Sequence, residues 1–140
     1  MKVRVMLVRE GRTGAKLEIT GPKSAFLFLQ PKARRLDREH FWRIDLDARN
    51  QIIGYETVSI GTLSASLVHP REVFVGALLA KAAGCIVSHN HPTGDPAPSP
   101  EDRETTRRLV KAGELLGVPV LDHIIIGDDR YYSFKESGLL

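Results

Sequence analysis

A short apolar run, Cys85-Ile86-Val87, constrains the fold most strongly because helical patterns flank it on both sides. Before it, Pro70 and Glu72 favour the first turn of a helix, and apolar residues then recur at helical spacing. After it, a second helical pattern runs from about Ser99 to Leu116. A short apolar run between two helices is typical of a central strand covered on both faces. The pattern therefore predicts an α/β layered domain with a mixed sheet.

Further strands are predicted on both sides of this unit. Residues 39–47 and 51–60 read as two strands joined by a turn, and residues 118–127 and 130–134 as a second pair. Nearer the N-terminus, residues 2–9 and 15–20 alternate in polarity and predict a β-hairpin. A short helix is expected from about Pro22 to Gln30, where Pro31 interrupts it.

Composition limits the class of protein. The chain has 140 residues, of which 42% are hydrophobic and 26% charged, as in a soluble globular domain. Its apolar runs are far shorter than the roughly 18 residues that span a bilayer, and its first residues lack the pattern of a secretory signal. We therefore expect a cytoplasmic protein with no membrane partner. The single cysteine, Cys85, is expected to be a buried structural thiol.

Basic residues gather in the N-terminal third. Residues 1–43 carry eleven Lys and Arg against four Asp and Glu, a net charge of +7, whereas residues 44–140 carry nine against thirteen, a net charge of −4. A basic region of this kind can face nucleic acid or an acidic partner. Since no stacking aromatic residues are interleaved with the charges, a solvated basic face is the alternative explanation.

The segment SHNHPTGDPAPSPED, residues 88–102, carries the candidate chemistry. Because side chains alternate along a strand, His89 and His91 should project from one face of the strand end. Ser99 fits the N-cap of the next helix, with Pro100 at its first position and Asp102 completing a capping box. A side chain in the first helical turn leans towards the N-terminus, so Asp102 can point at the two histidines. His89, His91 and Asp102 are therefore candidate metal ligands.

Three blocks of sequence carry a resemblance to a known family. HNHPTGDPAPSPED is similar to the HxHx(7)SxxD signature of the JAMM (MPN+/JAB) metalloproteases. Together with VHPREVF before it and VLDHIIIG after it, it resembles the RadC-like JAB domain of bacteria. The resemblance covers residues 36–140 and implies a JAB/MPN fold, a three-layer architecture similar to that of cytidine deaminases. Residues 1–35 would then form an N-terminal extension made of the hairpin and the short helix.

The resemblance also implies a function. It implies a Zn²⁺ ion held by His89, His91 and Asp102, and a hydrolase that cleaves a peptide or isopeptide bond in a peptide or protein substrate. Glu39 matches the general base of the family by position, although Glu56 and Glu72 are rivals on the residues alone. Ser99 matches the serine that supports the oxyanion, and its N-cap role accounts for it equally well.

Two further hypotheses remain open. The RadC resemblance also suggests a DNA-repair or DNA-binding module without peptidase activity, or a metal-dependent nuclease, with nucleic acid bound by the basic N-terminal third. His123 lies inside an apolar strand and is expected to be a core histidine, with a hydrogen bond to a metal ligand as the alternative.

Overall fold

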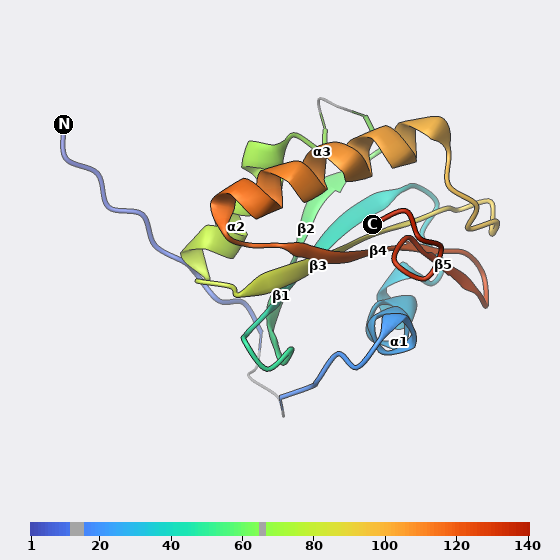
Figure 1. The fold of residues 1–140 in the computed structure, drawn as a ribbon, viewed down its shortest axis with the longest axis horizontal. Coiled ribbons are helices and arrows are strands. Elements are labelled where there is room, and N and C mark those ends of the chain that lie inside the picture. Colours follow the sequence, from blue (N-terminus) through green and yellow to red (C-terminus); the bar gives the residue numbers. More distant parts are fainter. Residues whose placement is uncertain (12–15, 65–66) are drawn as a thin grey trace.

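The computed structural model describes residues 1–11, 16–64 and 67–140 of the chain. Within these residues three helices and five strands follow one another along the sequence (Figure 1). Their bounds are α1 (Pro22–Ala33), β1 (His40–Leu46), β2 (Ile52–Ile60), α2 (Pro70–Leu79), β3 (Gly84–Asn90), α3 (Pro100–Leu116), β4 (Val120–Ile126) and β5 (Tyr131–Ser133).

The strands form one mixed sheet in the order β2-β1-β3-β4-β5. β1 is antiparallel to both β2 and β3, β3 and β4 are parallel, and β5 returns antiparallel to β4. Because β3 and β4 are parallel, their carboxyl ends lie at the same edge of the sheet. That edge is where open α/β sheets usually bind ligands, and the segment with His89 and His91 ends there.

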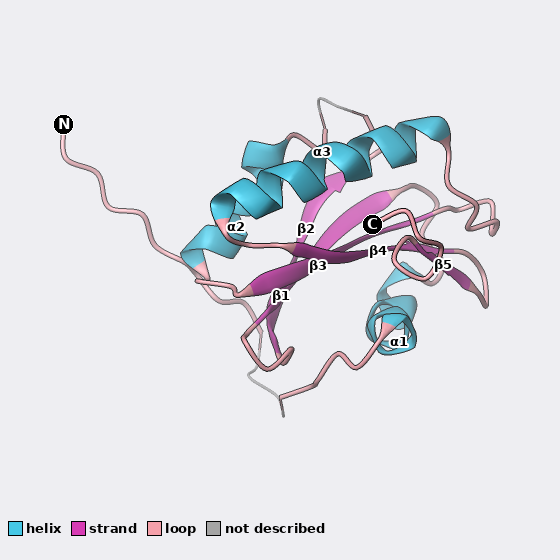
Figure 2. Ribbon diagram, viewed as in Figure 1, coloured by secondary structure: helices cyan, strands magenta, loops and turns pink. Residues whose placement is uncertain are grey.

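Helices cover both faces of the sheet, which confirms the predicted α/β architecture. α2 and α3 lie on one face and α1 lies on the other (Figures 1 and 2). β1 illustrates the alternation, since Phe41 joins the core beneath α2 and α3 whereas Trp42 and Ile44 join the core beneath α1. Every residue of β3 is buried, as expected for a central strand covered on both faces.

A buried ion cluster lies between the sheet and α2. The Arg43 guanidinium is 2% exposed and donates to both carboxylate oxygens of Asp45, at 2.6 and 2.9 Å. It also donates to Glu56 Oε1 at 2.6 Å and to the Val73 carbonyl at 2.7 Å. Gly76 of α2 leaves room for this cluster, because a Cβ there would lie 2.6 Å from one guanidinium nitrogen. The buried polar side chains of Arg43 and Asp45 in β1 thus form hydrogen bonds inside the protein.

The predicted N-terminal hairpin is contradicted by the structure. Residues 2–9 all lie within the described ranges and form no strand; the turn that would have joined the two strands falls partly on residues 12–15, outside the described residues. The other predicted strand is reduced to a bridge between Glu18 and Gln51, at the turn that joins β1 to β2. The alternating pattern was misleading because Val3, Val5 and Leu7 are exposed, and a strand needs a face to bury.

α1 is longer than predicted. It continues through Pro31 to Ala33, because Pro31 lies in the last turn and removes a single hydrogen bond near the end of the helix. Ala25, Phe26 and Leu29 bury the inner face of α1 against the sheet. The division of the chain into residues 1–35 and 36–140 stays a prediction.

Two other predictions concern the whole chain. None of the helices in the described ranges is long and apolar enough to cross a membrane. Cys85 is buried in β3, as expected, and burial raises the pKa of its thiol to about 12.

Candidate metal centre

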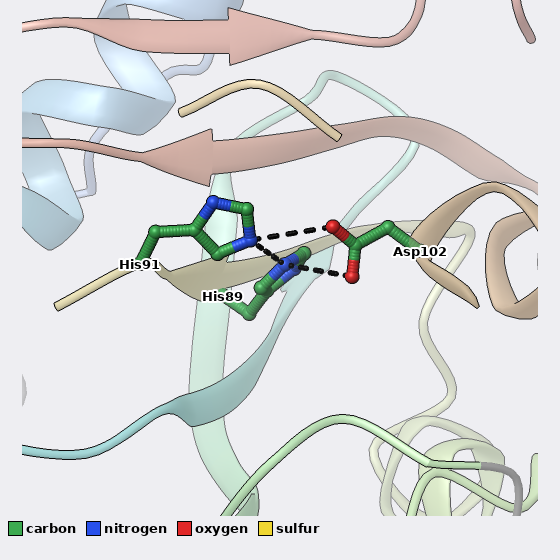
Figure 3. A group of neighbouring side chains, drawn as sticks. All are labelled: His89, His91 and Asp102. Atoms are coloured by element: carbon green, nitrogen blue, oxygen red, sulfur yellow. Dashed lines mark hydrogen bonds and ion pairs between the residues drawn. The ribbon is translucent and has the colours of Figure 1, made fainter. Parts of the chain in front are cut away.

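His89 and His91 stand at the carboxyl end of β3 and point the same way, as predicted from strand alternation (Figure 3). His89 is fully buried, and its strand pairs with β1 on one side and β4 on the other. His91 follows the last residue of β3, and its amide donates to the Ile126 carbonyl at 2.9 Å. Main-chain hydrogen bonds therefore fix the backbone at both histidines.

Asp102 reaches the histidines from the first turn of α3. The Ser99 amide donates to Asp102 Oδ2 at 2.8 Å, and the Asp102 amide donates to Ser99 Oγ at 3.0 Å, which is the predicted capping box. The carboxylate then faces β3, with Oδ1 3.3 Å from His89 Nε2 and Oδ2 3.2 Å from His91 Nε2 (Figure 3). The cap thus orients the carboxylate towards the histidines.

The donor atoms of His89, His91 and Asp102 fit a small divalent cation. The two Nε2 atoms are 3.0 Å apart, and all the donor atoms of the group lie within 4.8 Å of one another. Ligand atoms roughly 2.0–2.1 Å from a tetrahedral zinc ion are about 3.3 Å from one another. Two imidazoles and one carboxylate without a thiolate also suit zinc. These three residues form a group that can hold a metal ion.

The proton positions favour a cation in this group. His91 Nδ1 lies 2.8 Å from the Asp95 carbonyl, which can only accept, so Nδ1 carries the proton and Nε2 of the neutral ring carries a lone pair. That lone pair faces a carboxylate and another imidazole nitrogen. In the metal-free protein a proton can take the same place, and accordingly the hydrogen bond to Asp102 raises the pKa of His91. Burial alone would raise the pKa of Asp102, but the imidazoles of His89 and His91 beside its carboxylate outweigh burial and lower it.

A cleft of about 480 Å³ opens beside two residues of this group. Its lining includes His91 and Asp102 together with Glu39, Ser99 and Glu101. Glu39 precedes β1, and its Oε2 accepts from the Leu63 amide at 2.8 Å. The two rival carboxylates lie elsewhere: Glu56 binds Arg43, and Glu72 lies in the first turn of α2. Of the three carboxylates considered from sequence, Glu39 is therefore the one that shares a cleft with the metal-binding group.

Comparison with known proteins identifies the family. The family model of the RadC-like JAB domain matches residues 19–139. The chain belongs to this family. It is 53% identical over 125 residues to a UPF0758 protein of Symbiobacterium thermophilum, which covers 89% of this chain and 53% of that protein. It is 51% identical over 125 residues to a UPF0758 protein of Methanosarcina mazei, with 89% of this chain and 55% of that protein covered.

A third relative extends the match towards the N-terminus. A UPF0758 protein of Caldanaerobacter subterraneus is 49% identical over 135 residues, which cover 96% of this chain and 57% of that protein. This RadC-like JAB domain therefore spans about half the length of the curated relatives it matches.

Asn90 was not predicted to contribute to the site of this RadC-like JAB domain. It lies between the two histidines, and its Oδ1 accepts from the His40 amide at 2.7 Å. Its Nδ2 donates to the Arg38 carbonyl at 3.1 Å. These bonds hold the residues on either side of Glu39, so β3 positions the start of β1 as well as the histidines. No local sequence pattern indicates this contact, because the two residues it joins are about fifty positions apart in the chain.

His123 is buried, as predicted, and it contacts a residue of the metal-binding group. Its Nε2 lies 2.7 Å from His89 Nδ1, so the alternative considered from sequence, a hydrogen bond to a candidate ligand, is present in the structure. Its Nδ1 lies 2.5 Å from Thr106 Oγ1 of α3. Burial lowers the pKa of His123 well below its usual value, so its ring is neutral at pH 7. Thr106 was missed because nothing in its local sequence marks a threonine on the inner face of a helix.

Proposed function

We propose that this domain is a zinc-dependent hydrolase that cleaves a peptide or isopeptide amide bond. The observation that carries the proposal is the convergence of His89, His91 and Asp102 beside a cleft that Glu39 and Ser99 also line. A zinc ion held by the three residues would act as a Lewis acid that makes hydroxide available from water near neutral pH. Membership in the RadC-like JAB family supports this reaction class.

Glu39 is the proposed general base. Its carboxylate lines the same cleft as the metal-binding group, and its Oε2 accepts a hydrogen bond from the Leu63 amide. That amide fixes the carboxylate while leaving Oε1 able to accept a proton from water and to return it to the leaving nitrogen. Since Glu39 precedes β1, the sheet holds it at a fixed place relative to β3.

Ser99 is the proposed donor to the oxyanion. Sequence left its two roles, N-cap and oxyanion donor, as alternatives that compete for one hydroxyl. In the structure Ser99 Oγ acts as the cap by accepting from the Asp102 amide, which uses a lone pair and leaves the hydroxyl proton for another acceptor. A hydroxyl that also lines the cleft can direct that proton at a developing oxyanion.

The test separates metal binding from turnover. We expect the purified protein to bind about one zinc ion, and His89→Ala to lose it. Glu39→Gln should keep the zinc and lose hydrolysis of a panel of peptides and isopeptide-linked lysine substrates. Glu101→Gln is the matched control, because Glu101 lines the same cleft but is absent from the metal-binding group. Full activity in Glu39→Gln, or wild-type turnover that survives removal of all metal by a chelator, would refute the proposal.

Nucleic-acid binding is the second candidate function. A second pocket, of about 230 Å³, also borders His91, and its lining includes Arg34 and Arg35. Neither arginine has an ion pair within the described part of the chain. Two arginines without ion pairs beside the strand end, within a basic N-terminal third, suit contacts with phosphates.

A salt titration tests this second candidate. Binding to duplex or single-stranded DNA should weaken steeply as salt rises, and Arg34→Glu with Arg35→Glu should weaken it at low salt. Arg103→Glu with Arg107→Glu makes the same charge change on α3 and serves as the control. Cleavage of DNA that stops with chelator would indicate a metal-dependent nuclease. Unchanged affinity in the Arg34 and Arg35 variant would exclude the pocket as the contact.

A further inference from the structure

A buried series of hydrogen bonds connects His89 to Asp102 through atoms that are not the candidate ligand atoms. It runs from His89 Nδ1 to His123 Nε2 at 2.7 Å, from His123 Nδ1 to Thr106 Oγ1 at 2.5 Å, and from Thr106 Oγ1 to the Asp102 carbonyl at 2.7 Å. We call these three hydrogen bonds the His123 bridge. His89 and His123 are fully buried and Thr106 is 2% exposed, so water does not compete for these bonds. The bridge passes through three elements, β3, β4 and α3.

The acceptor at one end of the bridge determines which atom donates in each of the three hydrogen bonds. The Asp102 carbonyl can only accept, so the Thr106 hydroxyl gives it its one proton. Thr106 Oγ1 must then accept from His123, which places the proton of the neutral His123 ring on Nδ1. His123 Nε2 is left as an acceptor, and the proton of the third bond belongs to His89 Nδ1. His89 Nε2, which faces His91 and Asp102, is therefore a free lone pair.

Aromatic contacts hold the His123 ring in this orientation. The Phe134 ring stacks on it at a centroid distance of 4.8 Å and an interplanar angle of 10°. The Phe41 ring meets it edge-on, at 5.9 Å and 73°. A ring held in this way cannot rotate to exchange its two nitrogens without displacing the core around it. The direction of the bridge is thus set by packing as well as by the carbonyl.

We propose that His123 and Thr106 are positioning residues that hold His89 in the one tautomer able to bind a metal ion. The His123 bridge also ties β3 to the first turns of α3, and so fixes the separation between His89 and Asp102. The inference rests on the metal site of the proposed function, but it concerns residues that do not contact the metal or the substrate. Hydrogen bonds behind ligating histidines commonly change metal affinity by about 10–100-fold when they are removed.

Two substitutions at one position separate the hydrogen bond from the shape. His123→Phe keeps a flat ring between Phe41 and Phe134 but removes the acceptor for His89. His123→Gln supplies an amide oxygen to accept from His89 and an amide nitrogen to donate to Thr106, which is the same direction as in the wild type. Zinc affinity, measured by competition with a chromophoric chelator, should fall about 10–100-fold in His123→Phe and recover most of that loss in His123→Gln.

Ser88→Ala is the matched control. Ser88 is as buried as His89, and its hydroxyl donates to the Ile124 carbonyl of β4 at 2.7 Å. Its removal breaks one hydrogen bond between the same two strands without touching the metal-binding group. We expect Ser88→Ala to lower the unfolding temperature while leaving zinc affinity at the wild-type value. If Ser88→Ala lost as much zinc affinity as His123→Phe, the bridge would contribute only to stability, and the proposal would be overturned.

Nitrogen-15 NMR of the metal-free protein tests the tautomers directly. The proposal requires the proton on Nδ1 in both His89 and His123, and a protonated Nε2 in neutral His89 would overturn it. Thr106→Val provides the same test if His123→Phe fails to fold, since it should leave His123 free to adopt either tautomer and weaken zinc binding several-fold. A wild-type protein that binds no zinc would refute the proposed function, while the tautomer measurement would still decide for or against the bridge.

Discussion

Replacing Asn90 by alanine should loosen the start of β1 and, with it, Glu39. Asn90 is 4% exposed and makes two hydrogen bonds to the main chain on either side of Glu39, at 2.7 Å to the His40 amide and 3.1 Å to the Arg38 carbonyl. At about 0.5–1.5 kcal/mol for each bond, Asn90→Ala should lower the free energy of unfolding by about 1–3 kcal/mol. Urea unfolding measures this loss.

Amide hydrogen exchange shows whether Glu39 moves. The Leu63 amide donates to Glu39 Oε2, so its protection reports the position of that carboxylate. In Asn90→Ala we expect both the His40 and the Leu63 amides to exchange faster, by roughly five- to tenfold if each local opening becomes easier by about 1–1.4 kcal/mol. A Leu63 amide that exchanges at the wild-type rate while that of His40 accelerates would show that Asn90 does not position Glu39.

The control for this experiment lies at the other end of β1. Asp47 Oδ1 also accepts two main-chain hydrogen bonds, from Arg49 at 2.8 Å and Gln51 at 2.9 Å. Asp47→Ala should therefore remove the same number of bonds but leave the Leu63 amide protected. If both variants accelerate Leu63 equally, general destabilisation explains the effect.

Three other outcomes follow from the packing. Asp45→Asn should cost about 3–5 kcal/mol of unfolding free energy, because it removes the buried carboxylate that pairs with Arg43 and leaves half-exposed Glu56 to compensate the charge. Glu56→Gln should cost at most about 1 kcal/mol, and equal losses in urea unfolding would contradict this. Cys85 should resist iodoacetamide at pH 8.5 in the native protein, since burial raises the pKa of its thiol to about 12, and rapid labelling without denaturant would disprove it. Gly94→Ala should cost about 1–3 kcal/mol, because φ is +92° there and a Cβ would overlap the Asp128 carboxylate; a much smaller loss than this in thermal unfolding would argue against that strain.

The fold was predictable where neighbouring residues in the sequence show which side chains are buried. Cys85-Ile86-Val87 between two helices predicted the central strand, and the strand is buried along its whole length. The alternation in residues 2–9 looked equally regular, yet Val3 and Val5 are exposed and form no strand. The two segments differ in the tertiary contacts they make. Helices cover both faces of β3, whereas residues 2–9 belong to neither core cluster of the described chain. Periodicity states which side chains share a face, and only tertiary contacts decide whether that face is buried.

The metal-binding group was predictable for a related reason. His89 and His91 are related by strand alternation, and Asp102 is related to Ser99 by helix capping, so both halves follow from local geometry. Asn90 and His123 act across the sheet, through contacts with β1 and α3 that depend on strand order and register. The sequence pattern placed His123 in a buried strand. The hydrogen-bond partner of each ring nitrogen depends on tertiary contacts that the pattern does not show.

The capping box shows why stability and the metal-binding group are difficult to separate in this domain. Asp102 Oδ2 accepts the hydrogen bond that begins α3 and also faces His91, while Oδ1 faces His89. The carboxylate thus satisfies a helix terminus on one side and orients towards the histidines on the other. A substitution of Asp102 would remove both contributions at once, so a loss of activity there would not by itself identify a metal ligand. Variants at His123 leave the cap in place, and for that reason they test the metal-binding group more cleanly than a variant of Asp102.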